Sequence, residues 1–257
     1  MENDIPAVQI AAAPVYIGCA GWNLPAAVHA RFPVAGTHLQ RYAAVFPAVE
    51  INSSFYRPHR PATYARWRDT VPENFRFAAK IPKAITHDMR LRNPGPALEK
   101  FLAEVGGLGH KLGCLLVQLP PRLRYEESAA QAFFRILCGL TDASIVCEPR
   151  HPSWFGDEAA ALLAQREVAY VHADPSIAPV PECADARVEY LRLHGSPEVY
   201  HSAYNDTYLD CLAAEIAWKA HGGRQVWCIF DNTASGAAVP NALSLLGRLQ
   251  GTVAAAA

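Results

Sequence analysis

The sequence predicts a single-domain α/β protein, a TIM-type (β/α)8 barrel, on three observations. A length of 257 residues is typical of an eight-stranded barrel and long for one ordinary domain. Short apolar runs rich in β-branched and aromatic residues recur along the chain, each followed by a helix-like stretch, as expected for buried parallel strands. Five of these runs end in polar or chargeable residues, which places such residues at the carboxyl ends of the strands.

Eight predicted strands alternate with seven predicted helices. The strands cover residues 15–20, 48–53, 75–80, 113–119, 144–149, 168–173, 188–194 and 225–231. The helices cover residues 37–46, 61–70, 96–108, 128–139, 157–165, 208–221 and 239–249. Three prolines near 175–187 predict one degenerate crossover without a full helix. Residues 1–14 and 251–257 are expected to be tails, which leaves 15–250 as the barrel.

The alternative to the barrel is an open, doubly wound parallel sheet. Such a sheet normally carries a glycine-rich first turn that binds a phosphate group. Here the corresponding turn reads Gly18-Cys19-Ala20-Gly21-Trp22-Asn23, which does not match that fingerprint. The sequence therefore favours the closed barrel.

The composition is sufficient for a large core and gives no overall attraction to nucleic acid. Hydrophobic residues make up 51% of the chain, and the formal net charge is −1. The charge is unevenly distributed, because residues 57–92 contain nine Lys or Arg and three Asp or Glu. This basic sector favours a small anionic ligand such as phosphate, sulfate or a carboxylate, although a solvated helix face would have the same composition.

The seven cysteines lack the CxxC or Cys/His spacing of a metal site. Four of them lie in predicted strands, where a free thiol behaves as a small hydrophobic side chain: Cys19, Cys114, Cys147 and Cys228. Buried free thiols fit a reducing compartment. The first residues are acidic and lack the basic leader of a secretion signal, and no apolar stretch is long enough to span a bilayer. We therefore expect a cytoplasmic protein with no membrane partner.

Polar side chains at the strand ends form the candidate site. In a barrel the carboxyl ends of all strands meet at one mouth, so residues far apart in sequence become neighbours. The candidate acids and bases are Glu50, Glu148, His194 and Asp231. The candidate substrate contacts are Asn52, Tyr56, Lys80, His87, Gln118, Arg150, Arg192 and Asn232.

The alternation of side chains along a strand predicts different roles for the two glutamates. Glu148 shares its strand face with Arg150, whose charge favours an ionised carboxylate, so we expect it to orient a partner or act as a base. Glu50 shares its face with neutral Asn52, so we expect burial to raise its pKa and keep it protonated as an acid, unless Lys80 lies near enough to favour the ionised form. His194 is expected to be neutral near pH 7 and able to accept a proton.

Loop residues would complete this site. His87 is either a general acid or base or a loop histidine bonded to Asp88. The aromatic residues Tyr56, Trp22 and Trp154 would wall a pocket for a planar or sugar-like ligand, or else belong to the core.

A buried ion-pair network is the structural alternative for the whole set. Because buried ion pairs add little net stability, several of them in one place favour a functional site. The three acids are matched by Lys80, Arg150 and Arg192, so no metal is needed for neutrality. Although Glu50, Glu148, His194 and Asp231 are suitable ligands by type, we expect neither a metal nor another cofactor.

Seven groups of residues, in order along almost the whole chain, form a specific pattern together. They are Gly18–Trp22, Glu50–Tyr56, Phe77–Lys80 with Ile85–His87, Leu115–Pro121, Glu148–Trp154, Arg192–Gly195 and Phe230–Thr233. In these segments the chain resembles the YecE-like family, also catalogued as domain of unknown function seventy-two. The resemblance implies a TIM-type barrel with a site and leaves the reaction open. Many relatives carry a basic residue where this chain has Ser196, so no phosphate contact is carried over there.

Three functions are consistent with the sequence. The first is a metal-independent enzyme that performs acid–base chemistry on a small anionic or polyhydroxylated substrate bound at the mouth. The second is a metal-assisted phosphodiesterase or nucleic-acid-processing barrel, which needs a carboxylate–histidine metal cluster and a basic rim. The third is a non-catalytic anion-binding protein. The low net charge favours the first over the second, and the sequence does not separate the first from the third.

Overall fold

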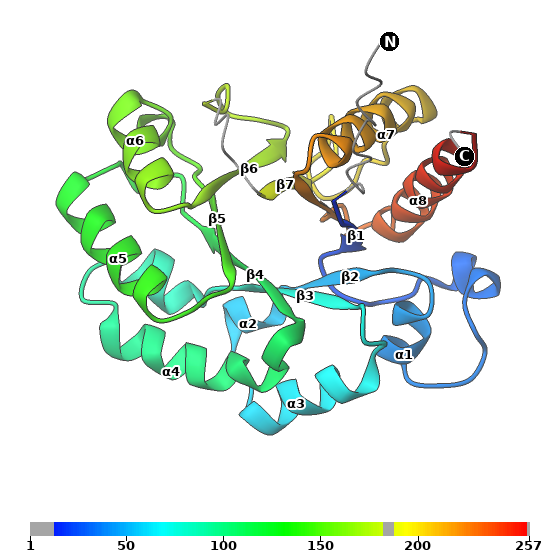
Figure 1. Cartoon of the computed structure of the whole chain (residues 1–257), viewed down its shortest axis with the longest axis horizontal. Helices are drawn as coiled ribbons and strands as arrows, with labels where there is room; N and C mark the ends of the chain where they lie inside the picture. The colour runs from blue at the N-terminus through cyan, green and yellow to red at the C-terminus, as the bar shows by residue number, and fades with distance from the viewer. Residues whose placement is uncertain (1–12, 182–187, 256–257) are drawn as a thin grey trace, which may run out of the picture.

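The computed structural model describes residues 13–181 and 188–255 of the chain. Eight strands alternate with helices along it (Figure 1). The strands are β1 (Val15–Cys19), β2 (Ala48–Ile51), β3 (Arg76–Lys80), β4 (Leu112–Gln118), β5 (Ser144–Glu148), β6 (Ala169–Asp174), β7 (Val188–Leu193) and β8 (Gln225–Phe230). The eight predicted strands are therefore all present.

The strands form one sheet in which every neighbouring pair is parallel. Their order is β1-β8-β7-β6-β5-β4-β3-β2. A parallel bridge between Ala20, just after β1, and Glu50 in β2 joins the two ends of this sheet. The predicted TIM-type barrel is thus confirmed, with all carboxyl strand ends at one mouth.

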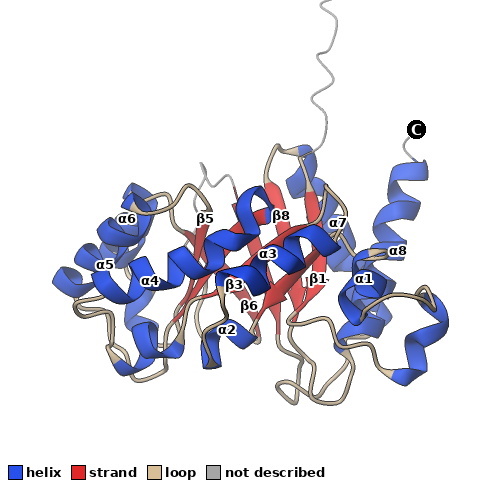
Figure 2. Ribbon diagram, turned by 90° about the horizontal axis from the view of Figure 1, so that it is seen from below, coloured by secondary structure: helices blue, strands red, loops and turns tan. Residues whose placement is uncertain are grey.

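Helices surround the strands, and Figure 2 shows α3 and α4 lying across them. They are α1 (His38–Ala43), the short α2 (Ser53–Tyr56), α3 (Pro61–Thr70), α4 (Gly95–Val105), α5 (Glu127–Gly139), α6 (Asp157–Gln165), α7 (Asp206–His221) and α8 (Ala238–Ala255). Local sequence explains several of the starts. Thr37 and Gln40 form a reciprocal capping box at α1. Pro61 occupies the first turn of α3, where a missing N–H costs nothing.

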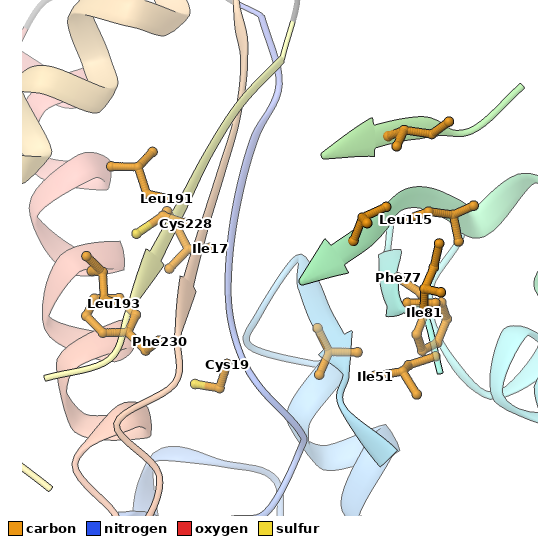
Figure 3. Packing of buried hydrophobic residues seen from close by; sticks show 14 of the residues in the cluster. Ile17, Cys19, Ile51, Phe77, Ile81, Leu115, Leu191, Leu193, Cys228 and Phe230 are labelled. Carbon is orange, nitrogen blue, oxygen red and sulfur yellow. The ribbon is translucent and has the colours of Figure 1, made fainter. Parts of the chain in front are cut away.

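The barrel wall separates two apolar layers, because alternate residues of a strand face opposite sides. Phe77, Leu115 and Cys228 belong to the large core between strands and helices (Figure 3). A second cluster consists of strand residues alone: Ala48, Ala78, Cys114, Leu116, Val146, Val171, Tyr190, Trp227 and Ile229. Since it contains no helix residue, this cluster fills the barrel interior, as expected for a closed barrel.

The interior changes from apolar to charged toward the mouth. Two residues further along six of the strands, the same face carries Glu50, Lys80, Gln118, Glu148, Arg192 and Asp231. The fold therefore places a layer of polar and charged side chains directly above an apolar floor.

The ends of the chain and one crossover differ from the strand–helix rhythm. Residues 175–181 contain no helix, and the rest of the crossover predicted near 175–187 lies outside the described residues. Of the predicted tail 1–14, only residues 13 and 14 are described. Helix α8 continues to Ala255, beyond the predicted boundary at 250, because the alanines near its end favour helix.

None of the helices in residues 13–181 and 188–255 combines the length and the apolar character needed to cross a membrane.

Candidate active site

The guanidinium of Arg192 is the centre of the charged layer. Arg192 is 1% exposed. Its Nε and Nη2 atoms donate hydrogen bonds to both carboxylate oxygens of Glu50 over 2.8–3.2 Å. Its Nη1 atom donates to Oε2 of Glu148 at 3.1 Å, and Nη2 lies 2.9 Å from Oδ2 of Asp231. One cation from β7 therefore bonds carboxylates from the ends of β2, β5 and β8.

This arrangement fixes the charge of Arg192 and removes it as a free anion ligand. Burial alone would lower its pKa, but Glu50, Asp231 and Glu148 outweigh burial and raise the pKa well above its usual value. Every edge of the guanidinium faces a protein carboxylate. The predicted contact between Arg192 and a substrate anion is therefore not available in this arrangement.

Glu50 lies in a different environment from the one that we predicted. Both of its oxygens accept hydrogen bonds from Arg192, and Oε2 also accepts one from the Tyr190 hydroxyl at 2.9 Å. Asn52 does not share its face, because the chain leaves the strand after Ile51 and Asn52 adopts helical angles before α2. The predicted pairing of Glu50 with Asn52 is therefore wrong, and so is the reason given for a protonated Glu50.

His194 is bonded through both ring nitrogens. Nδ1 lies 3.0 Å from Oδ2 of Asp231, and Nε2 lies 3.1 Å from Oε1 of Glu148. The Nη2 atom of Arg150, which also forms an ion pair with Glu148, lies 2.7 Å from the same Nε2. Nε2 therefore has both a hydrogen-bond acceptor and a hydrogen-bond donor within reach.

The protonation states of His194 and Glu148 follow from these contacts. Burial lowers the pKa of His194, but its hydrogen bonds to Asp231 and Glu148 outweigh burial and raise the pKa above the usual value. The prediction of a neutral His194 near pH 7 is thus not supported. Burial likewise acts against ionisation of Glu148, but Arg192, His194 and Arg150 lower its pKa well below the usual value, in line with the predicted ionised carboxylate.

A loop after β7 folds over His194. Gly195, with φ of +94°, turns the chain, and its N–H donates to the Tyr204 hydroxyl at 2.8 Å. A Cβ atom at this glycine would lie 2.8 Å from the Ser202 carbonyl oxygen, so the turn requires glycine. The ring of Tyr200 then packs edge-on against the imidazole of His194 at 5.6 Å.

Lys80 lies at the mouth end of β3 with its ammonium unpaired. The residue is 5% exposed, and Nζ lies 4.1 Å from the centre of the Phe55 ring. Within residues 13–181 and 188–255 the ammonium has neither a hydrogen bond nor an ion pair within 4 Å. Burial and then the charge of Arg192 lower the pKa of Lys80 to about 8, against the opposing effect of Glu50 and the other carboxylates.

His87 lies beside Lys80, and its ring does not form the predicted hydrogen bond with Asp88. Its Nδ1 atom lies 2.8 Å from the Thr86 hydroxyl, and its ring packs edge-on against Phe55 at 5.0 Å. Asp88 instead lies 3.5 Å from Nζ of Lys83. The predicted contact between His87 and Asp88 is therefore wrong.

Two further predicted contacts, Gln118 and Asn232, lie outside the charge network. Gln118 ends β4 and is half-buried. Asn232 is fully buried, and its side-chain amide donates to the Ser202 carbonyl and to Oδ1 of Asn241 at 2.9 and 3.0 Å. Asn232 thus holds the loop after β7 against α8, which is a structural role.

The predicted aromatic wall is not assembled around the charge network. Tyr56 is 74% exposed, with its ring edge-on to Phe55. Trp22 packs against Trp67, and Trp154 is buried and donates its indole N–H to a backbone carbonyl. The last two side chains belong to the core, because they contact the helix layer.

Sequence reasoning missed Tyr190 and Tyr200. Tyr190 lies two residues before Arg192 on β7, so the same alternation that grouped Arg192 with His194 could have found it. No sequence signal placed Tyr200 over His194, because that contact depends on the path of a loop.

The four side chains considered as metal ligands surround Arg192 instead. Among the described residues, no group of three or more His, Cys, Asp or Glu is arranged to hold a metal ion. The guanidinium lies between Glu50, Glu148 and Asp231, so a metal ion bound there would have to displace it.

The fold and these contacts define a TIM-type barrel with a buried charge network at its carboxyl-end mouth. Residues 16–256 match the family model described as "Protein of unknown function DUF72", and the chain belongs to this family. The resemblance found in the sequence is thereby confirmed.

Named relatives and solved structures agree with this assignment. The chain is 32% identical over 151 residues to UPF0759 protein YecE of Escherichia coli K12, covering 58% of this chain and 53%, about half, of that relative. It is 23% identical over 263 residues to UPF0759 protein YunF of Bacillus subtilis, covering 90% and 93%. A crystal structure of a DUF72 family protein from Thermotoga maritima shares the fold with a TM-score of 0.77 and 22% identity, and the match covers 92% of this chain and 99% of that one. A DUF72 family protein from Enterococcus faecalis matches with a TM-score of 0.75 and 21% identity, over 94% of this chain and 99% of that one.

Proposed function

We propose that the protein is an enzyme that performs acid–base chemistry on a small anionic or polyhydroxylated substrate at the mouth of the barrel. The observation that carries this proposal is the pair of partners at Nε2 of His194. When His194 is charged, Nε2–H can donate to Glu148, and when it is neutral, Nε2 can accept from Arg150. Both protonation states therefore find a hydrogen bond at the same atom.

Asp231 gives the imidazole a fixed orientation for such a role. Its carboxylate accepts from Nδ1 in either protonation state of His194, so Nδ1 keeps its proton and Nε2 exchanges one. A carboxylate that orients a histidine in this way is a recurring feature of general acid–base sites. The raised pKa of His194 favours the charged imidazole, which is the form that acts as an acid.

The charge of the network supports an anionic substrate. Three carboxylates pair with two guanidiniums, and the Lys80 ammonium lies near enough to be affected by their charge, so a protonated His194 leaves one net positive charge in a buried site. Arg150 is the natural contact for an anion, because its side chain is 17% exposed whereas that of Arg192 is 1% exposed. Its planar fork suits an oxyanion better than a lysine would.

Hydrogen–deuterium exchange into candidate substrates tests this function. The protein is incubated in D2O with a panel of sugar phosphates, 2-hydroxy acids and 2-oxo acids, and proton NMR follows the loss of C–H signals. We expect exchange into at least one compound, slowed about 10²–10⁴-fold in His194→Gln and in Glu148→Gln. His110→Gln is the matched control, since His110 pairs with exposed Glu73 at the other end of the barrel.

Thermal denaturation with the same panel separates the enzyme from a non-catalytic anion-binding protein. If a compound raises the melting temperature and none exchanges a proton, the binding protein is the better account. A melting temperature unchanged by every anion would contradict both proposals.

We also propose a cytoplasmic location. The six cysteines in the described part of the chain are free, and four of them are buried in strands. Free thiols in this number fit a reducing compartment.

A further inference from the structure

Lys80 is a buried cation whose position the stability of the barrel does not explain. Its ammonium makes no hydrogen bond within the described residues, and the face of Phe55 is its nearest favourable contact at 4.1 Å. A cation–π contact of this kind recovers only part of the free energy that is lost when an ammonium is removed from water. A methionine or leucine would fill the same space without that cost.

The carboxylates of the network beside Lys80 are already paired with Arg192. Arg192 donates hydrogen bonds to Glu50 and Glu148 and forms an ion pair with Asp231, so none of these carboxylates depends on Lys80 for a partner. Among the described residues, the ammonium of Lys80 therefore has no hydrogen-bond acceptor for its three N–H bonds. It lies at the carboxyl end of β3, where substrates bind in barrels of this type.

The environment also makes the neutral amine accessible near neutral pH. With a pKa of about 8, roughly a tenth of Lys80 is neutral at pH 7, whereas for a lysine of pKa 10.5 the share is roughly one in three thousand. A neutral lysine amine is the form that attacks carbonyl groups.

We propose that Lys80 Nζ forms a covalent imine with the carbonyl carbon of an aldehyde or ketone that also carries an anionic group. This inference rests on the proposed function, because it assigns the substrate class of the same site. The anionic group would contact Arg150, and the carbonyl would lie against Nζ.

The step balances with the groups of the site and one water molecule. The Nζ lone pair forms a C–N bond as the carbonyl π electrons move to oxygen, and one proton passes from nitrogen to that oxygen. The resulting hydroxyl takes a second proton from an acid, for which His194 is the candidate, and leaves as water to give the iminium. The iminium draws electrons from the neighbouring carbon, so a base can remove a proton there, and hydrolysis later restores the amine.

Reductive trapping with glyoxylate, a small aldehyde that carries a carboxylate, tests the imine. The full-length protein is mixed with glyoxylate and sodium cyanoborohydride at pH 7, and peptide mass spectrometry locates carboxymethylated lysines. The chain has only five lysines, at positions 80, 83, 100, 111 and 219, so each can be quantified. We expect Lys80 to be labelled at least about tenfold faster than Lys83, which is exposed.

Two variants make the test specific. Lys80→Arg keeps a cation beside Phe55 but cannot form an imine, so it should lose the adduct and any deuterium exchange into 2-oxo acids or ketose phosphates. Lys83→Met should keep both. Labelling of Lys80 no faster than that of Lys83 overturns the imine, and wild-type mapping alone decides this if Lys80→Arg does not fold.

The result also distinguishes failure of the imine from failure of the proposed function. If deuterium exchange persists in Lys80→Arg, the imine is wrong and acid–base catalysis stands. If Lys80 is labelled selectively but no compound exchanges a proton, the amine is reactive and the acid–base function is wrong.

Discussion

Two lysines at opposite ends of the barrel are equally buried and differently bonded. Each is 5% exposed. Lys111 precedes β4 at the amino end, and its Nζ donates to the carbonyls of Arg68 and Val71 at 3.0 and 2.8 Å, with Glu73 at 3.6 Å. Lys80 ends β3 at the mouth and has an aromatic ring in place of these acceptors.

The difference teaches that burial alone does not identify a functional charge. Lys111 closes the end of α3 by satisfying backbone carbonyls that would otherwise lack a partner, which is a structural role. Lys80 satisfies nothing comparable and lies where barrels bind their substrates. Among buried cations, the count of satisfied hydrogen bonds is therefore more informative than depth.

Replacing Arg192, the fully paired cation at the mouth, should have the largest effect on the free energy of unfolding. Arg192→Met should lower the free energy of unfolding by about 3–5 kcal/mol, because it leaves Glu50, Glu148 and Asp231 buried without their common partner. Urea unfolding followed by circular dichroism measures this. Arg150→Met is the control and should cost far less, since its side chain is 17% exposed. Equal losses in the two variants would contradict the central role of Arg192.

Replacing Lys111, the lysine with a structural role, should have the next largest effect on the free energy of unfolding. Lys111→Met is expected to lower the free energy of unfolding by roughly 2–4 kcal/mol, because it leaves two backbone carbonyls without a donor. Lys80→Met, measured in the same way at pH 7, should cost less or even stabilise the protein. If both lysines prove equally costly to replace, the distinction between them fails.

A pH series sharpens the contrast further. The pKa of Lys80 is about 8 in the folded protein and 10.5 for an ordinary lysine, so the unfolded chain binds more protons between these values. The stability of the wild type should therefore rise relative to Lys80→Met, by roughly 2 kcal/mol between about pH 7.5 and 9.5. Taking the difference cancels the buried cysteines and tyrosines, which titrate in both proteins. A difference that stays constant with pH would show that Lys80 is not desolvated.

The smallest effect concerns His194. Because its pKa is raised in the folded protein, its stabilising contribution is fully present below the unfolded value of 6.5 and is lost as pH rises through the folded value. The advantage of the wild type over His194→Gln should shrink accordingly. Nitrogen-15 NMR of labelled histidine should show Nδ1 protonated throughout and Nε2 losing its proton above pH 6.5. Loss of the Nδ1 proton first would reverse the roles given to the two nitrogens.

The alternation of side chains along strands predicted which residues belong to the charge network better than it predicted which of them lie together. It grouped Glu148 with Arg150 and Arg192 with His194 correctly, because the chain stays extended just past the ends of β5 and β7. It failed for Asn52, because a helical turn begins directly after β2. Alternation is therefore reliable only as far as the extended backbone continues.

Contacts across the barrel could not be predicted at all from local pattern. Arg192 and Glu50 are 142 positions apart, and their bond depends on the barrel diameter and on side-chain length. The raised pKa of His194 has the same origin, since Asp231 and Glu148 come from different strands. The fold was predictable because each strand and helix has a hydrophobic pattern that can be read over a few consecutive residues. The protonation states of the site depend instead on side chains that are distant in sequence.

The apolar layer beneath the charged layer fills the barrel interior below the site. Tyr190 and Trp227 stack at 6.0 Å in the barrel interior, and both are fully buried. Because this layer is apolar and buried, we expect any ligand of the charged layer to enter through the opening at the mouth. The loop that carries Tyr200 stands at that opening, packed on His194. His194 is 0% exposed beneath this loop, so under the proposed function we expect a ligand to reach its imidazole only after the loop is displaced.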